Sequence, residues 1–160
     1  MQFQDLWKHH PTVKSLWDDA PCTTNGKRNF EDQCAIRMST AFDGAGVDTS
    51  SFDRMFPKRR CWFGHGKGHI LAAEEMAKWI DASGKFGQSE KFDGKKGFSH
   101  INGRTGIIFF KDYYGTNNQG DHIDLWNGSR LTNPRSLFVF NMFSEGGDYR
   151  KAKVWFWVVP

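Results

Sequence analysis

The chain has few cysteines, few prolines and no long apolar run. Three cysteines, at positions 22, 34 and 61, are too few for the disulfide framework of a small secreted domain. No segment approaches the roughly 20 apolar residues that a membrane-spanning helix needs. The N-terminal residues lack the basic and apolar regions of a secretory signal. We therefore expect no membrane insertion, and synthesis in the cytoplasm without a signal peptide.

Internal repeats and low-complexity linkers are also missing, so we expect one domain over residues 1–160. Aromatic residues make up 16% of the chain, which excludes a disordered protein. The net charge of +4 favours encounters with acidic polymers but identifies no partner. Charge and tryptophan content leave open a nucleic-acid- or glycan-binding module without catalysis.

The order of predicted elements indicates an α+β fold, with N-terminal helices packed on an antiparallel sheet. Apolar spacing predicts short helical turns over 3–9 and 13–18 and helices over 29–42 and 69–82. The segment 84–103 is rich in glycine and lysine, so we expect a surface loop or irregular hairpin. The predicted strands cover residues 105–110, 121–126, 137–140 and 153–159.

Cys34 lies within the first turns of the predicted helix 29–42, which we expect Asn29 to cap and Gly44 and Gly46 to end. A helix N-terminus and a nearby imidazole lower the pKa of a thiol and make it a nucleophile. The unpaired N–H groups at the same helix start also suit an oxyanion. Cys34 is therefore the candidate nucleophile among the three cysteines.

His122 is the best-placed base among the six histidines. Strand alternation puts His122, Asp124 and Trp126 on one face, and we expect that face to look across at the Cys34 helix. Asp124 could orient the imidazole, although an i, i+2 neighbour should reach the ring awkwardly. We therefore predict that Asn133, on a turn leading into the next strand, orients the ring, because Asn serves this role in Cys-His-Asn sites, and Asp124 is the alternative.

Cys61, His65 and His69 form a C-x3-H-x3-H pattern that invites a zinc interpretation. Glycines interleave these residues, the spacing fits no common zinc template, and the sequence offers no evident fourth ligand. We therefore expect no metal and no cofactor. Whether Cys22 and Cys61 form a disulfide stays open.

Four blocks of the sequence, 30–39, 105–110, 120–128 and 129–133, resemble the fourth family of type VI secretion amidase effectors. The resemblance implies a papain-like domain of the NlpC/P60 kind. It also implies cleavage of the γ-D-glutamyl–meso-diaminopimelate amide in the peptidoglycan stems of Gram-negative bacteria. By that resemblance Cys34 is the nucleophile and His122 the base. The family usually has Asp where this chain has Asn133, so the third member stays open.

The same resemblance implies export by type VI secretion to the periplasm of target bacteria, and a periplasmic immunity protein that blocks the active site. No nucleic-acid partner is expected for such an enzyme. A lipid acyltransferase on the same scaffold is a further alternative, and it would leave cell-wall peptides unchanged.

Overall fold

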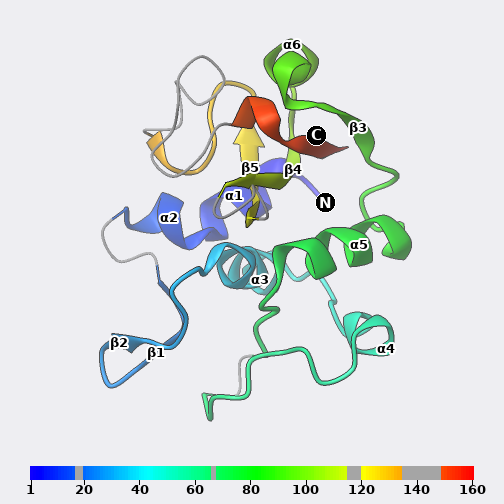
Figure 1. The fold of residues 1–160 in the computed structure, drawn as a ribbon. Helices are drawn as coiled ribbons and strands as arrows, with labels where there is room; N and C mark the ends of the chain where they lie inside the picture. Colours follow the sequence, from blue (N-terminus) through cyan, green and yellow to red (C-terminus); the bar gives the residue numbers. More distant parts are fainter. Residues whose placement is uncertain (17–19, 66–67, 115–119, 135–148) are drawn as a thin grey trace.

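A four-stranded antiparallel sheet forms the centre of the computed structural model, which describes residues 1–16, 20–65, 68–114, 120–134 and 149–160. Its strands run in the order β3-β6-β4-β5, and the short strands β1 and β2 pair separately (Figure 1). The strands are β1 Thr23–Thr24, β2 Lys27–Arg28, β3 Glu90–Asp93, β4 Thr105–Tyr114, β5 Gly120–Asn127 and β6 Lys153–Val158.

Helices accompany the sheet, so the predicted α+β class is confirmed. The α-helices are α1 Phe3–His9, α2 Pro11–Lys14, α3 Cys34–Gly44, α4 Phe52–Met55, α5 Ala73–Ser83 and α6 Gly97–Ile101. Short 3-10 turns occur at η1 Gly94–Lys96 and η4 Tyr149–Lys151. Within the described residues, no helix is both long and apolar enough to cross a membrane.

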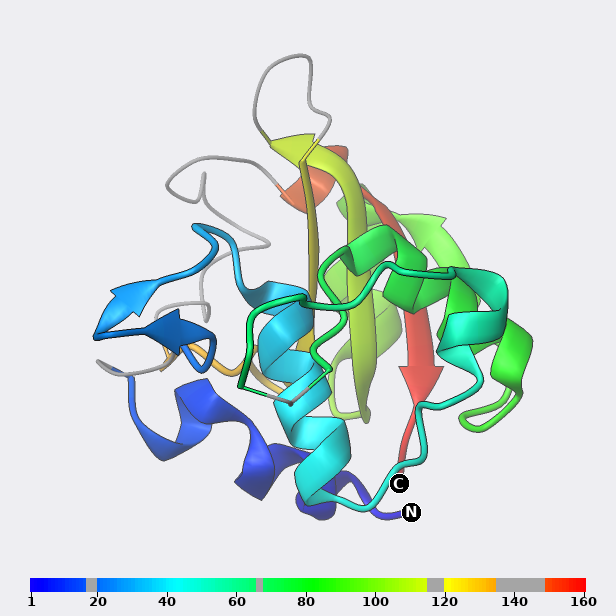
Figure 2. The same cartoon turned by 90° about the horizontal axis from the view of Figure 1, so that it is seen from below.

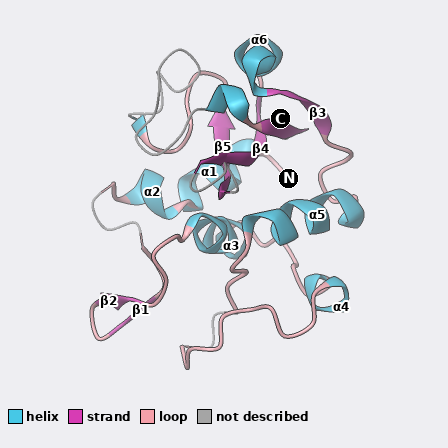
Figure 3. Cartoon of the chain, in the orientation of Figure 1, coloured by secondary structure: helices cyan, strands magenta, loops and turns pink. Residues whose placement is uncertain are grey.

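Both faces of the sheet are covered by apolar side chains. Ile107 of β4 and Ile123 and Leu125 of β5 lie in one buried cluster with Met38 of α3 and residues of α1 and α5. Alternate strand residues form a second cluster with Ile101 at the end of α6. Figure 3 shows the corresponding layers, with α3 and α5 on one side of the strands and α6 on the other.

The strand β5 lies at one edge of the sheet and pairs with β4. His122 is the cross-strand partner of Phe110, and Asp124 is the partner of Ile108. The two ends of the chain are joined by a hydrogen bond, in which the Phe3 N–H donates to the Pro160 carbonyl over 2.7 Å. The two termini therefore lie side by side, as Figure 2 shows.

Helix α3 begins at Cys34, five residues later than the prediction, and Asn29 does not cap it. The flanking residue Gln33 makes no capping hydrogen bond, and the Asp32 carboxylate instead accepts from the Cys34 N–H over 3.1 Å. The predicted end is close to the observed one, with Gly46 in the left-handed conformation at φ +74°. Cys34 thus occupies the first helical position, closer to the N-terminus of the helix than its sequence pattern showed.

Other boundaries also differ from the predictions. The segment 84–103 is not a loop or hairpin throughout, because it contains β3, η1 and α6. The predicted helix over 69–82 begins at Ala73. The predicted strand over 137–140 lies outside the described residues, as does part of the predicted turn over 13–18.

Candidate active site

Cys34 is placed by the start of α3 and is 5% exposed. The residue before Cys34 is Gln33, and its side-chain amide ties it to the backbone of Cys22. The amide oxygen accepts from the Cys22 N–H over 3.0 Å, and the amide nitrogen donates to the Cys22 carbonyl over 2.9 Å. The Cys34 N–H, expected to be open for an oxyanion, donates to Asp32 Oδ1. The helix start is therefore held firmly, and this N–H must leave Asp32 before it can serve an oxyanion.

His122 faces Cys34 from the edge strand β5. A hydrogen bond with the Cys34 side chain contributes to raising the pKa of the imidazole. On its other side, Nε2 lies 3.1 Å from Asp124 Oδ2. Because Nε2 contacts the carboxylate, Nδ1 is the nitrogen left for the thiol. The His122 side chain is 22% exposed, so the ring is mostly buried but not sealed from solvent.

Asp124 is buried beside His122 and has several further partners. Its Oδ1 accepts from the Thr132 hydroxyl over 2.7 Å and from the Leu125 N–H over 2.8 Å. His10 Nε2 lies 3.8 Å from the same oxygen. His10 Nδ1 accepts from the Thr12 N–H, so the proton of the neutral ring belongs on Nε2 and points towards Asp124. The carboxylate is thus fixed in orientation by groups from three parts of the chain.

The two titratable partners shift in the directions of an ion pair. Burial lowers the pKa of His122, but the electrostatic effect of Tyr149 and the hydrogen bonds with Asp124 and Cys34 raise it well above its ordinary value. Burial raises the pKa of Asp124, but the hydrogen bond and charge of His122, together with His10 and Thr132, lower it overall. The site therefore favours a protonated imidazole next to an ionised carboxylate.

The predicted geometry around His122 is wrong in two respects. The face of β5 that packs towards α3 carries Ile123 and Leu125, not the polar residues. Because β5 is an edge strand, His122 can still meet the N-terminus of α3. The i, i+2 neighbour Asp124 does reach the ring, whereas Asn133 lies on an exposed bend. The structure thus brings together Cys34, His122 and Asp124.

Sequence reasoning missed His10, Thr132 and Tyr149 as neighbours of the site. Thr132 lies within the block 129–133 that resembles the amidase effector family, so that resemblance is a signal by which it could have been found. Its contact with Asp124 does not follow from the spacing of residues in the sequence. His10 precedes the first turn of α2 and is buried, and histidine is a residue type of intermediate burial, so its sequence gives no sign of this position. Tyr149 stacks 4.4 Å from Tyr113, measured between ring centroids.

A second group of side chains could hold a metal. Cys22 joins Cys61, His65 and His69, and one ligand atom from each lies within 4.8 Å of the others. The expectation that a fourth ligand is missing is therefore wrong. All three cysteines are free thiols in this structure.

Comparison with known proteins identifies the family to which the chain belongs. The family model described as type VI secretion system (T6SS), amidase effector protein 4 (Tae4) matches residues 30–157. A search of curated protein sequences finds no match. Solved structures of similar fold include Tae4 from Salmonella typhimurium, in complex with the immunity protein Tai4 from Enterobacter cloacae. That structure is 24% identical, with a TM-score of 0.71 and coverage of 99% of both chains.

A second similar structure is Tae4 from Enterobacter cloacae, which is 18% identical with a TM-score of 0.71, over 99% of this chain and 96% of the other. The Tae4–Tai4 complex from Salmonella Typhimurium gives 23% identity and a TM-score of 0.69, over 99% and 98% of the two chains. At these identities the structures establish a common fold, while the family model covers most of the chain. The chain therefore belongs to the Tae4 family of type VI secretion amidase effectors.

Proposed function

We propose that this protein is a cysteine amidase in which Cys34 is the nucleophile, His122 the proton carrier and Asp124 the orienting group. One observation carries the proposal: a single imidazole joins a thiol at a helix N-terminus to a buried carboxylate. This is the arrangement of nucleophile, base and orienting group that covalent amide hydrolysis requires.

The chemistry follows from the positions of these groups. The Cys34 thiol transfers its proton to His122, which gives the protonated imidazole that the site favours, and the thiolate sulfur attacks the carbonyl carbon of the amide. The protonated His122 then gives its proton to the leaving amine as the C–N bond breaks, which leaves a thioester on Cys34. Water hydrolyses the thioester, with His122 accepting a proton from water, and the acid product departs as the thiol is restored.

Asp124 suits the orienting role better than Asn133. Its contact with Nε2 holds the ring with Nδ1 towards Cys34, and its negative charge stabilises the imidazolium. The Thr132 hydroxyl and the Leu125 N–H keep the carboxylate from rotating away. Asn133 is exposed, so it is placed to contribute less to ring orientation.

The substrate that we propose is the peptide stem of Gram-negative peptidoglycan, cleaved at the γ-D-glutamyl–meso-diaminopimelate bond by a papain-like domain of the NlpC/P60 kind. The family description as an amidase effector of type VI secretion supports an amide in a target bacterium. The periplasm is then the site of action. Because related Tae4 structures contain the immunity protein Tai4, we also propose a periplasmic immunity protein that covers the Cys34–His122 site.

Digestion of a purified disaccharide tetrapeptide, followed by mass spectrometry of the products, tests the substrate and the bond together. We expect one cut, giving a disaccharide dipeptide ending in D-glutamate and a dipeptide beginning with diaminopimelate. Fragments from another bond would reject the proposed specificity. An intact substrate, combined with acylated lipid or with salt-sensitive nucleic-acid binding, would instead support one of the alternative functions.

A further inference from the structure

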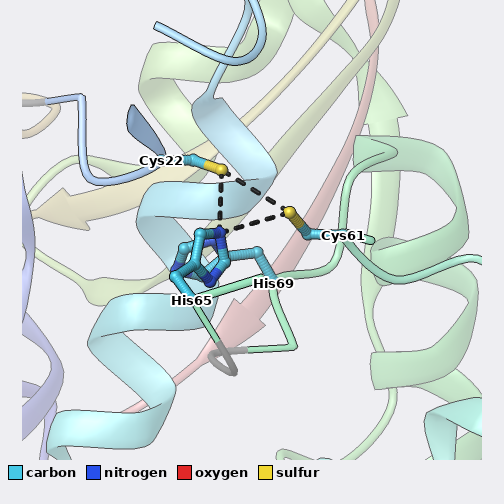
Figure 4. Close-up of side chains that lie close together, drawn as sticks. All are labelled: Cys22, Cys61, His65 and His69. Carbon is cyan, nitrogen blue, oxygen red and sulfur yellow. Dashed lines mark hydrogen bonds between the residues drawn. The ribbon is translucent and has the colours of Figure 1, made fainter. Parts of the chain in front are cut away.

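The Cys–His cluster, defined as Cys22, Cys61, His65 and His69, draws on two separate segments of the chain. Cys22 precedes the β1–β2 hairpin, and the other three residues lie between α4 and α5. Figure 4 shows the four side chains converging on one point beside helix α3. Their ligand atoms all lie within 4.8 Å of one another. Convergence of four soft or borderline donors from distant parts of a sequence is typical of a structural metal site.

Three distances within the Cys–His cluster are close to those of a tetrahedral site. The Sγ atoms of Cys22 and Cys61 are 3.6 Å apart, and each lies 3.3 Å from His65 Nε2. Tetrahedral zinc with the usual bond lengths separates two sulfurs by about 3.8 Å and a sulfur from a nitrogen by about 3.6 Å. A zinc ion therefore fits among the two sulfurs and His65 Nε2 after shifts of a few tenths of an ångström. The ligand atom of His69 lies within 4.8 Å of all three and completes the set.

We propose that the Cys–His cluster binds one structural Zn²⁺ ion. Two thiolates and two imidazoles are a recurrent donor set for tetrahedral zinc, whereas hard cations prefer oxygen ligands. Four protein ligands leave no position for substrate or water, so this metal stabilises the fold and performs no chemistry. The proposal does not depend on amidase activity.

The surroundings of the cluster hold its ligands in place. Asn29 Nδ2 donates to the Cys22 sulfur over 3.4 Å, and the Cys61 N–H donates to the His69 carbonyl over 2.8 Å. The first of these bonds reaches a ligand atom, so it orients the sulfur and disperses the charge of a thiolate, and the second ties the backbones of two ligand residues together. The ligands are thus supported by contacts of the kind that surround natural metal centres.

Both segments of the cluster are attached to α3, the helix that carries Cys34. The Gln33 amide clamps the backbone of Cys22, and the Ser39 hydroxyl accepts from the Ile70 N–H over 2.9 Å. A metal that joins the two segments would therefore stabilise α3 at two points, at Gln33 just before the helix and at Ser39 within it. Loss of the metal should loosen these flanks and lower the melting temperature.

Metal analysis of the full chain, purified under reducing conditions with zinc present, tests the proposal directly. We expect one zinc per chain. Titration of the metal-free protein with Co²⁺ should give the absorption bands of tetrahedral cobalt with thiolate ligands. The Cys34→Ser variant is the matched control, because it removes the third thiol and should leave both the zinc content and the cobalt spectrum unchanged.

Graded variants sharpen the test. Cys61→Ser and His65→Ala should each weaken Co²⁺ binding by more than about 100-fold, and Asn29→Ala by about tenfold, as supporting contacts do. Cys61 and His65 are only half-buried, so these changes should not prevent folding. A wild-type protein that binds neither zinc nor Co²⁺ with its thiols reduced would overturn the proposal. A cobalt spectrum that disappears in Cys34→Ser but persists in Cys61→Ser would do the same.

Discussion

Two groups of cysteine and histidine lie near the same helix, and their other neighbours differ. At the N-terminus of α3, Cys34 shares His122 with the carboxylate of Asp124. In the Cys–His cluster, two thiols and two imidazoles meet, and the part of the chain that the structure describes adds no carboxylate to them. We therefore expect the same residue types to have different chemical uses, depending on which charged group completes each set.

The carboxylate of Asp124 is the main difference between the Cys34–His122 site and the Cys–His cluster. A negative charge beside an imidazole holds a proton on the ring, which prepares it to protonate a leaving group. Among the described residues, the Cys–His cluster has no carboxylate in its ligand set to hold a proton on an imidazole. A divalent cation can instead bind its two cysteines as thiolates and neutralise their charge. Changing one member of each group should therefore affect activity at the first and metal binding at the second.

Apart from loss of the nucleophile itself, the largest effect of this kind is expected for His122→Ala. Loss of the proton carrier should reduce kcat/KM for the disaccharide tetrapeptide by about 10²–10⁴-fold, the range of general acid–base catalysis. The zinc content should stay at the wild-type value, because His122 lies outside the Cys–His cluster. Parallel loss of activity and metal would show that the two groups are not independent.

A smaller but still large effect should separate the two candidate orienting residues. Asp124→Asn should lower kcat/KM by about 10²-fold or more, because the imidazole loses its charged partner and its tautomer is no longer fixed. Asn133→Ala should change it by less than about threefold, as we expect for an exposed side chain if Asp124 orients the ring. The reverse ranking, measured in one steady-state assay, would give the orienting role to Asn133.

The pH dependence of the residual activity tests the ion pair itself. Because Asp124 raises the pKa of His122, the protonated ring persists to higher pH, and activity should fall only when the pH rises through that raised value. In Asp124→Asn the pKa of His122 should fall, so the alkaline limb of kcat/KM should move to lower pH. An unmoved alkaline limb would mean that Asp124 does not act through the charge of His122.

The smallest expected effect concerns the link between the Cys–His cluster and α3. Ser39→Ala leaves the Ile70 N–H without its acceptor, which should lower the free energy of unfolding by about 1–3 kcal/mol. Thr40→Ala is the matched control, since the Thr40 hydroxyl donates to the Ile36 carbonyl of its own helix. Urea unfolding should show a clear loss for Ser39→Ala only; equal losses would indicate a helix effect and not a loop attachment.

Local pattern was sufficient for part of the fold and the site. Helical spacing and alternation placed Cys34 near a helix start and His122 on a strand, with Ile123 and Leu125 turned into the core. The strand β3 was missed because its residues pair with β6, about sixty positions further along the chain. Pairing of that kind leaves little trace in a glycine-rich segment.

In both the Cys34–His122 site and the Cys–His cluster, the residues that contact the predicted ones are brought there by packing between distant parts of the chain. Residues two apart on a strand are separated by about 6.6 Å, so reach between His122 and Asp124 requires both side chains to lean together. Thr132 and Leu125 hold Asp124 in that position, and neither contact is visible in spacing. Cys22 joins Cys61 because the hairpin segment folds back against α3, so the fourth ligand could not be found from the C-x3-H-x3-H pattern.

The most direct test of the central claim is the rate at which Cys34→Ala and Cys34→Ser cleave the disaccharide tetrapeptide. Circular dichroism and zinc content should show that both variants keep the wild-type fold and metal. We predict that neither variant forms detectable product, because the alanine has no nucleophile and a serine hydroxyl is a much weaker one than a thiol. Cleavage by Cys34→Ala at the wild-type rate would contradict the assignment of Cys34 as the nucleophile.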